Sequence, residues 1–430
     1  MTLNLAPSHL SNGSDARLLE LLQADGHPSL QVLTAAQQRA LLASALISTV
    51  PSALAHLEWP RPNPDNDDLF LSHYGHYVES MAGLLVVQAL WPLPSPPQRV
   101  LCCGCGPKFL GERGLNGLAT AALWRGTNLS RCLDAHPQPL HIGALCLADR
   151  HAAHHSKHLQ AVNNLNAELL LRATDGVQAS LEAAISTLRA APELLAAEAT
   201  LNSTGARDLV GTHIAGTLRA AAAAAAAGAA AGAAAGADLR RAPLLLLLHR
   251  TNRRSIREAN WGELTRGLEA LNPGRVLIVA MEGLPAAAQL LLASRCDILV
   301  GAQGNGLAHL LWQPFGSAVV EIFPHFTQEG GEGTGWTNDW PFLTRLKGSI
   351  YRSLDSKQGA VSPINHNVAD LAHQLHIGDL DLNVPAVLQE VEAVIAAWRG
   401  VQGELQAGKP VSMRQHWHPL YTGEDAWKWR

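Results

Sequence analysis

The feature that most constrains the fold is a regular alternation of short apolar runs and helical segments between residues 244 and 354. Continuous apolar runs of four to eight residues predict strands that are buried on both faces. The predicted strands are 244–248, 276–280, 297–300, 318–322 and 349–354, and the predicted helices are 261–271, 284–294 and 306–312. This alternation predicts a parallel sheet with helices on both faces.

The N-terminal half shows the same elements in a less regular order. We predict a helix over 76–89, strands over 99–103 and 141–148, and a helix over 151–188 that breaks at 175–176. A chain of 430 residues exceeds one typical core, so we expect an α/β protein with two Rossmann-like domains. The expected parts are a peripheral helical lead-in (1–58), an N-terminal domain (59–215), an Ala/Gly linker (216–243), a C-terminal domain (244–380), and a C-terminal helix and tail (381–430). Asn383 is the predicted cap of that helix, with Pro385 in its first turn.

Charge and hydropathy exclude several classes of partner. The net charge of −4, from 32 basic and 36 acidic residues, does not favour nucleic acid or an anionic membrane. The first residues lack the basic and apolar regions of a signal peptide. Residues 220–237 are all Ala or Gly and lack the large apolar side chains of a spanning helix. We therefore expect no nucleic-acid partner and no transmembrane segment in this chain.

Polar groups follow three of the predicted strands, at the edge where parallel sheets place ligands. Arg250 and Arg254 follow the strand 244–248, and their guanidinium groups suit a diphosphate. The glycine-rich residues 301–306 precede a helix, and their backbone N–H groups suit an anion. Glu321 lies at the end of 318–322 and suits ribose hydroxyls. Spacing alone leaves three alternatives open: a solvated charge cluster for the arginines, a tight turn for the glycine-rich residues, and a turn cap for Glu321.

Three ordered blocks resemble glycosyltransferase family 61. Residues 297–324 resemble the signature of that family, residues 244–264 resemble its arginine-containing segment, and residues 73–80 resemble its segment with a histidine and a later acidic residue. Within the family, the sequence from Gly306 to Leu311 is similar to the EGF-domain-specific enzymes. The matching positions are Arg250, Arg254, Asn260, Glu263, Leu264, Gly304, Gly306, Leu307, His309, Leu310, Pro314 and Glu321.

The resemblance implies a GT-B arrangement, in which two Rossmann-like domains face each other across a cleft. It implies transfer of a sugar from a UDP-sugar to a hydroxyl of a protein or glycan acceptor, without a metal or other cofactor, in the endoplasmic reticulum or Golgi. Glu79 would be the general base, with His76 supporting or replacing it, because their i, i+3 spacing places both on one helix face. The donor-binding residues would be Arg250, Arg254, Gln303, Gly304, Asn305, Gly306, His309 and Glu321.

Some residues differ from the family 61 pattern, and these differences leave other functions possible. Gln303 stands where the family has His, and His73 stands where it has Asn, so one alternative is a non-catalytic relative of these transferases. Residues 100–107 resemble the first motif of S-adenosylmethionine-dependent methyltransferases, although the acidic residues of that motif are missing. Two groups could bind a metal but lack completing ligands: Cys102 with Cys105, and the helical face of His151, His154, His155 and His158.

Overall fold

The fold was analysed in a computed structural model of the chain. The residues that it describes are 3–5, 30–32, 48–57, 74–90, 97, 99–103, 114–124, 128–131, 140–149, 167–192, 194–196, 242–250, 255–281, 284–322, 339–354, 361–363, 380–409, 411 and 413–416.

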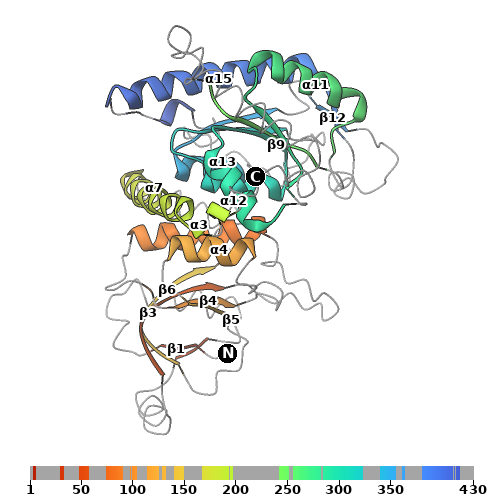
Figure 1. The fold of residues 1–430 in the computed structure, drawn as a ribbon. Helices are drawn as coiled ribbons and strands as arrows, with labels where there is room; N and C mark the ends of the chain where they lie inside the picture. Colours follow the sequence, from red (N-terminus) through yellow and green to blue (C-terminus); the bar gives the residue numbers. More distant parts are fainter. Residues whose placement is uncertain are drawn as a thin grey trace, which may run out of the picture.

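A five-stranded parallel sheet forms the centre of the C-terminal half (Figure 1). Its strands are β7 (Leu245–Leu248), β8 (Val276–Val279), β9 (Ile298–Ala302), β10 (Ala318–Ile322) and β11 (Ile350–Leu354), in the order β11-β10-β9-β7-β8. The chain therefore moves outward to one side from β7 to β8 and then to the other side through β9, β10 and β11. This reversal makes the gap between β7 and β9 the topological switch point, where open α/β sheets place their ligands.

Helices cover both faces of this sheet. One face is packed against α11 (Glu258–Leu271) and α15 (Val384–Gln406). The other is packed against α12 (Ala286–Arg295), the 3-10 helix η6 (Asn305–Trp312) and α13 (Asp339–Lys347). The expected α/β class and the predicted strands of this half are confirmed. The predicted cap is confirmed as well, because the Asn383 side chain accepts a hydrogen bond from the Ala386 N–H.

A second parallel sheet lies in the N-terminal half. Its strands are β3 (Ser48–Leu57), β4 (Arg99–Cys103), β5 (Asn128–Arg131) and β6 (Leu140–Asp149), in the order β5-β4-β3-β6. Within its described residues, the helices of this half are α3 (Tyr74–Leu90), α4 (Leu115–Leu123) and α7 (Ala167–Arg189). The remaining elements are the parallel pair β1 (Leu3–Leu5) and β2 (Leu30–Val32), the antiparallel pair β12 (Val361–Pro363) and β13 (Leu380–Leu382), and η9 (Met413–His416).

Two local predictions for the N-terminal half were wrong. Residues 48–57 were expected in a peripheral helical lead-in, but they form β3, which pairs with both β4 and β6. The sequence does not predict this strand, because its alanines favour helices and Pro51 has no N–H to donate to the hydrogen bonds of a sheet. The break at 175–176 is also absent, since α7 continues through both residues. Gly176 instead allows close packing: a Cβ there would lie 2.7 Å from the Ala89 Cβ in α3.

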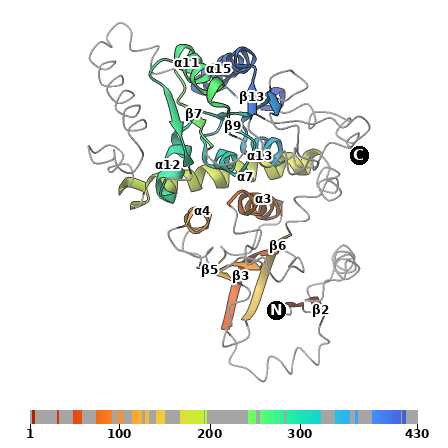
Figure 2. The same cartoon turned by 90° about the vertical axis from the view of Figure 1, so that its right-hand side faces the viewer.

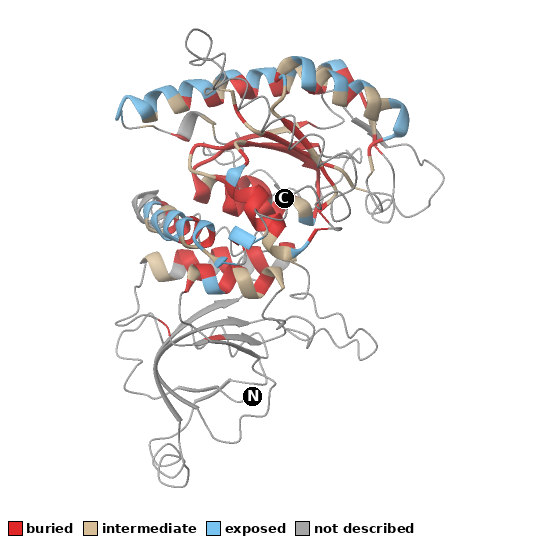
Figure 3. Cartoon of the chain, viewed as in Figure 1, coloured by how far each residue is buried: buried red, intermediate tan, exposed pale blue. Residues whose placement is uncertain are grey.

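One apolar layer joins the helices of the two halves. Buried side chains of α3, α4 and α7 belong to the same core cluster as those of α12, η6 and α13. Figures 1 and 2 show α3, α4 and α7 between the two sheets, and Figure 3 shows buried residues at the centre of this region. None of the helices within the described residues combines the length and the apolar character needed to cross a bilayer.

Lys347 is an unusual member of this layer. It is the last residue of α13, its side chain is 0% exposed, and its Nζ has no hydrogen-bond partner among the described residues. Burial lowers the pKa of Lys347 from 10.5 to about 8, while nearby Glu182 acts to raise it and Arg189 to lower it. Holding the charged form of this amine inside the layer therefore destabilises the fold.

Replacing Lys347 with Met should raise the free energy of unfolding at pH 7 by about 3 kcal/mol, the energy that corresponds to this pKa shift. The wild-type protein should gain the same energy between pH 8 and 10.5, because in that range the unfolded chain binds the proton more tightly than the folded chain. Urea unfolding across this range measures both effects. The exposed Lys409→Met variant is the control. A Lys347→Met protein that is less stable than the wild type at pH 7 would contradict this account.

Candidate functional site

The carboxyl ends of β7 and β9 are joined at the switch point by an arginine. Arg250 follows β7 directly, and its Nη1 donates a hydrogen bond of 2.7 Å to the backbone carbonyl of Gln303, just beyond β9. The ladder continues past β7 on the other side, where the His249 N–H donates to the Val279 carbonyl at 2.8 Å. The structure thus places the Arg250 guanidinium directly beside the glycine-rich loop.

Glycine makes this approach possible. Gly304 has a φ of +147°, a conformation that L side chains rarely adopt, and a Cβ there would lie 2.9 Å from Arg250 Cζ. Gly301 and Gly306 both face Leu248 of β7: a Cβ on Gly301 would lie 3.0 Å from its side chain, and one on Gly306 would lie 3.1 Å from it. The loop therefore combines a fixed cation with closely approaching backbone, which is an arrangement that suits a phosphate group.

Gln303 is fixed mainly by its backbone. Its carbonyl accepts from Arg250, its N–H donates to the Ile322 carbonyl at 2.9 Å, and its side chain is 7% exposed. The position therefore holds the loop to β10 and to the arginine at the same time. An amide side chain at this position can donate a hydrogen bond but cannot become cationic, unlike the histidine of the family pattern.

Glu321 lies on β10 directly opposite Gly301 of β9 in the strand register. Its side chain is 2% exposed, and the Tyr351 hydroxyl of β11 donates to its Oε2 at 2.5 Å. A ribose bound by Glu321 would therefore share the carboxylate with Tyr351. Sequence reasoning did not single out Tyr351, since a tyrosine in an apolar strand is most simply a core residue.

The first turn of α3 meets the glycine-rich loop. A Cβ on Gly75 would lie 2.5 Å from Asn305 Oδ1 and 3.5 Å from Asn305 Cα, so the backbone of α3 lies against the start of η6. At the end of η6, Trp312 Nε1 donates a hydrogen bond of 2.5 Å to the Tyr74 hydroxyl. The structure thereby brings the start of α3, which belongs to that sequence block, beside a loop that is more than two hundred residues away along the chain.

His309 is held inside η6 as a neutral ring. Gln289 of α12 donates through its Nε2 to the Leu284 carbonyl, so its Oε1 faces His309 Nε2 at 3.1 Å and accepts from it. The ring of His309 lies 5.1 Å from the Tyr74 ring, and its Nδ1 is buried without a hydrogen-bond partner among the described residues. His309 is 1% exposed, so in this structure it packs beneath the loop.

Other candidate site residues are described only in part or lie outside the described residues. His76 and Glu79 lie in α3, whose backbone at these positions is described and whose side chains there are not. Arg254 and the histidine face at 151–158 lie outside the described residues. Among the residues that the structure does describe, no group of three or more His, Cys, Asp or Glu side chains is arranged to hold a metal.

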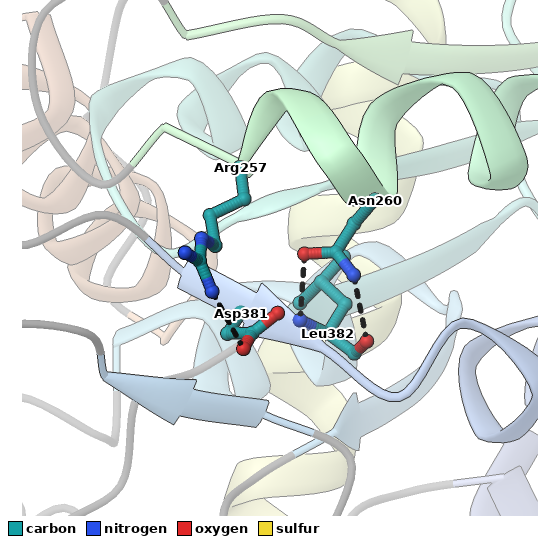
Figure 4. Close-up of polar contacts among 4 residues, drawn as sticks. All are labelled: Arg257, Asn260, Asp381 and Leu382. Atoms are coloured by element: carbon teal, nitrogen blue, oxygen red, sulfur yellow. Dashed lines mark hydrogen bonds and ion pairs between the residues drawn. The ribbon is translucent and has the colours of Figure 1, made fainter.

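Asn260, the asparagine of the arginine-containing block, binds the backbone of β13 (Figure 4). Asn260 Nδ2 donates to the Leu382 carbonyl at 3.1 Å, and its Oδ1 accepts from the Leu382 N–H at 3.2 Å, so one side chain satisfies both backbone groups. Arg257 forms an ion pair of 3.1 Å with Asp381 next to it. These contacts fix the start of α11 against β13.

No family model matches the chain. The chain is 32% identical over 111 residues to a Drosophila melanogaster protein named EGF domain-specific O-linked N-acetylglucosamine transferase. The similar region covers 26% of this chain and 19% of that protein. The chain thus matches only about a fifth of the length of that relative, and the similarity supports a glycosyltransferase-type function in general.

His309 makes the protein sensitive to acid. Burial lowers the pKa of His309 from 6.5 to about 4, so between these values the unfolded chain binds a proton that the folded chain does not. The free energy of unfolding should therefore fall by about 3 kcal/mol from this residue as the pH drops from 6.5 to 4. Replacing His309 with Gln should remove this part of the slope, which urea unfolding at a series of pH values measures. Equal slopes for the two proteins would contradict the assignment, because carboxylates contribute equally to both.

Proposed function

We propose that the protein is a glycosyltransferase that moves a sugar from a UDP-sugar to a hydroxyl of a protein or glycan acceptor without a metal ion. The observation that carries the proposal is the Arg250 guanidinium held beside Gly304 at the switch point of the C-terminal sheet. The similarity to the Drosophila transferase supports the same class of reaction. No other cofactor is part of the proposed reaction.

The donor side of the reaction requires charge neutralisation as the diphosphate leaves. Arg250 and Arg254 would supply cations, and the backbone of Gly304, Asn305 and Gly306 would supply N–H donors. The bond from Arg250 to the Gln303 carbonyl pre-orients the guanidinium before any donor binds, which lowers the cost of ordering it. Glu321 would bind the ribose hydroxyls, and His309 would support the loop from beneath.

The acceptor side requires removal of a proton from the attacking hydroxyl. Glu79 is the proposed base, and His76 lies one helical turn before it in α3. The contact between Gly75 and Asn305 supports this assignment, since it places the start of that helix against the donor loop. The proton would move from the hydroxyl oxygen to the carboxylate while that oxygen forms the bond to the anomeric carbon and the UDP oxygen leaves it.

We also propose that the two parallel sheets belong to the two domains of a GT-B transferase, with the divisions predicted from the sequence except that the N-terminal domain includes β3. The order of the C-terminal strands, with its switch point between β7 and β9, supports a nucleotide-binding role for that half. The shared apolar layer between the halves indicates that the site would occupy the edge where α3 meets the loop, rather than an open gap along the whole boundary.

Gln303 favours a second candidate function, that of a protein that binds a nucleotide sugar without transferring it. The amide cannot supply the positive charge that a histidine could add near the leaving group. The methyltransferase alternative depends on residues 104–107, which lie outside the described residues, so the structure leaves it untested.

Replacing Arg250 with Ala should weaken UDP binding by about 1.5–3 kcal/mol, the range for charge-assisted contacts. Gly304→Ala should have a similar effect, because the added Cβ would displace the guanidinium. Calorimetric titration with UDP measures both. Arg257→Ala is the matched control. Arg257 is an exposed arginine that also follows β7, but its side chain pairs with Asp381 and not with the loop. Unchanged UDP affinity in Arg250→Ala would overturn the donor site.

Turnover should be observed as UDP release from one member of a panel of UDP-sugars and should persist in EDTA. The name of the Drosophila relative makes UDP-N-acetylglucosamine and an EGF domain the first pair to test, with UDP-xylose and UDP-arabinose beside them. Activity that EDTA abolishes and manganese restores would contradict the proposed metal independence. UDP binding without turnover of any sugar would favour the non-catalytic candidate.

A further inference from the structure

Tyr74 and Gly75 together contact both ends of η6. Gly75 meets Asn305, the first residue of η6, and the Tyr74 hydroxyl accepts a hydrogen bond from Trp312, the last residue of η6. The Tyr74 ring also lies 5.1 Å from the ring of His309, between these two points. Contacts at both ends of one element fix a helix in rotation as well as in position.

The partners of Tyr74 are themselves held rigidly. Trp312 is fully buried and is among the largest side chains of the shared layer. His309 is bonded to Gln289, which is bonded in turn to the Leu284 carbonyl before α12. Burial also raises the pKa of the Tyr74 hydroxyl, so this group stays protonated and keeps its hydrogen-bonding capacity at neutral pH. Tyr74 is therefore anchored to a part of the core that does not depend on α3 alone.

We infer that Tyr74 is a positioning residue that sets the first turn of α3 against the donor loop through its contacts with Trp312 and His309. This inference rests on the proposed function, in which α3 carries the base and η6 begins at the donor loop. The hydroxyl of Tyr74 touches neither the donor nor the acceptor in this role. Its effect is to fix the distance and angle between the two halves of the site, to which the rate of transfer is sensitive.

The test compares Tyr74→Phe with Tyr77→Phe in the full chain. Each change removes one hydroxyl from the same helix, but the Tyr77 hydroxyl bonds to Thr120 of α4, whereas the Tyr74 hydroxyl bonds to Trp312 of η6. In Tyr74→Phe we expect a fall in kcat of about tenfold or more with UDP affinity unchanged within about twofold. In Tyr77→Phe we expect a similar loss of stability without that fall in kcat. The double variant Tyr74→Phe, Trp312→Phe should show little further fall in kcat, since both substitutions remove the same hydrogen bond.

Hydrogen exchange of the same proteins reports the positioning without requiring turnover. Tyr74→Phe should increase exchange in peptides covering 301–312 as well as 74–90, whereas Tyr77→Phe should affect 74–90 and 115–123 and leave 301–312 unchanged. Equal exchange at 301–312 in the two variants, or equal kcat, would overturn the inference. A wild-type protein that binds UDP but turns over no sugar would overturn the proposed transfer reaction instead, and the exchange at 301–312 would still decide the role of Tyr74.

Discussion

The arrangement of this protein depends on the apolar layer that α3, α4 and α7 share with α12, η6 and α13. Helices of one parallel sheet normally cover that sheet alone, but here those of the N-terminal half bury their apolar faces against those of the C-terminal half. Removing this surface from water is the main force that holds the two halves together. The candidate site lies where this layer reaches the carboxyl edge of the C-terminal sheet. The packing of the layer therefore determines the geometry of the site.

The buried polar side chains of this layer differ in how fully they are hydrogen-bonded. Gln289 uses both ends of its amide, whereas Lys347 Nζ and His309 Nδ1 have no partner among the described residues. Unpartnered buried groups destabilise a fold, and the direction of both pKa shifts reflects this desolvation. The layer is thus held together by its apolar surface in spite of these two groups, and its stability should change with pH at both ends of the neutral range.

The site combines fixed and adjustable parts. Arg250, Gly304 and Gln303 form a connected unit that joins two strand ends, and Glu321 is held by Tyr351 on the next strand. Their positions follow from adjacent strands of one sheet. The proposed base lies on a different element, and its position relative to this unit depends on the contacts of Tyr74 and Gly75 with η6. A transferase built this way would separate donor binding, which the sheet determines, from proton transfer, which the helix contact determines.

The sequence by itself determined the class of fold and the strands of the C-terminal half, because continuous apolar runs and the caps between them are local signals. It also placed Arg250, the glycine-rich loop and Glu321 at one edge, since every strand of a parallel sheet ends on the same side. It failed at β3, where Pro51 and alanines carry no local strand signal, and at Gly176, which serves a contact with Ala89. Only the tertiary structure decided that His309 is buried, that Asn260 binds a backbone, and that Tyr74 meets Trp312. Such contacts join residues far apart in the chain, and their geometry is fixed by packing, which no local pattern encodes.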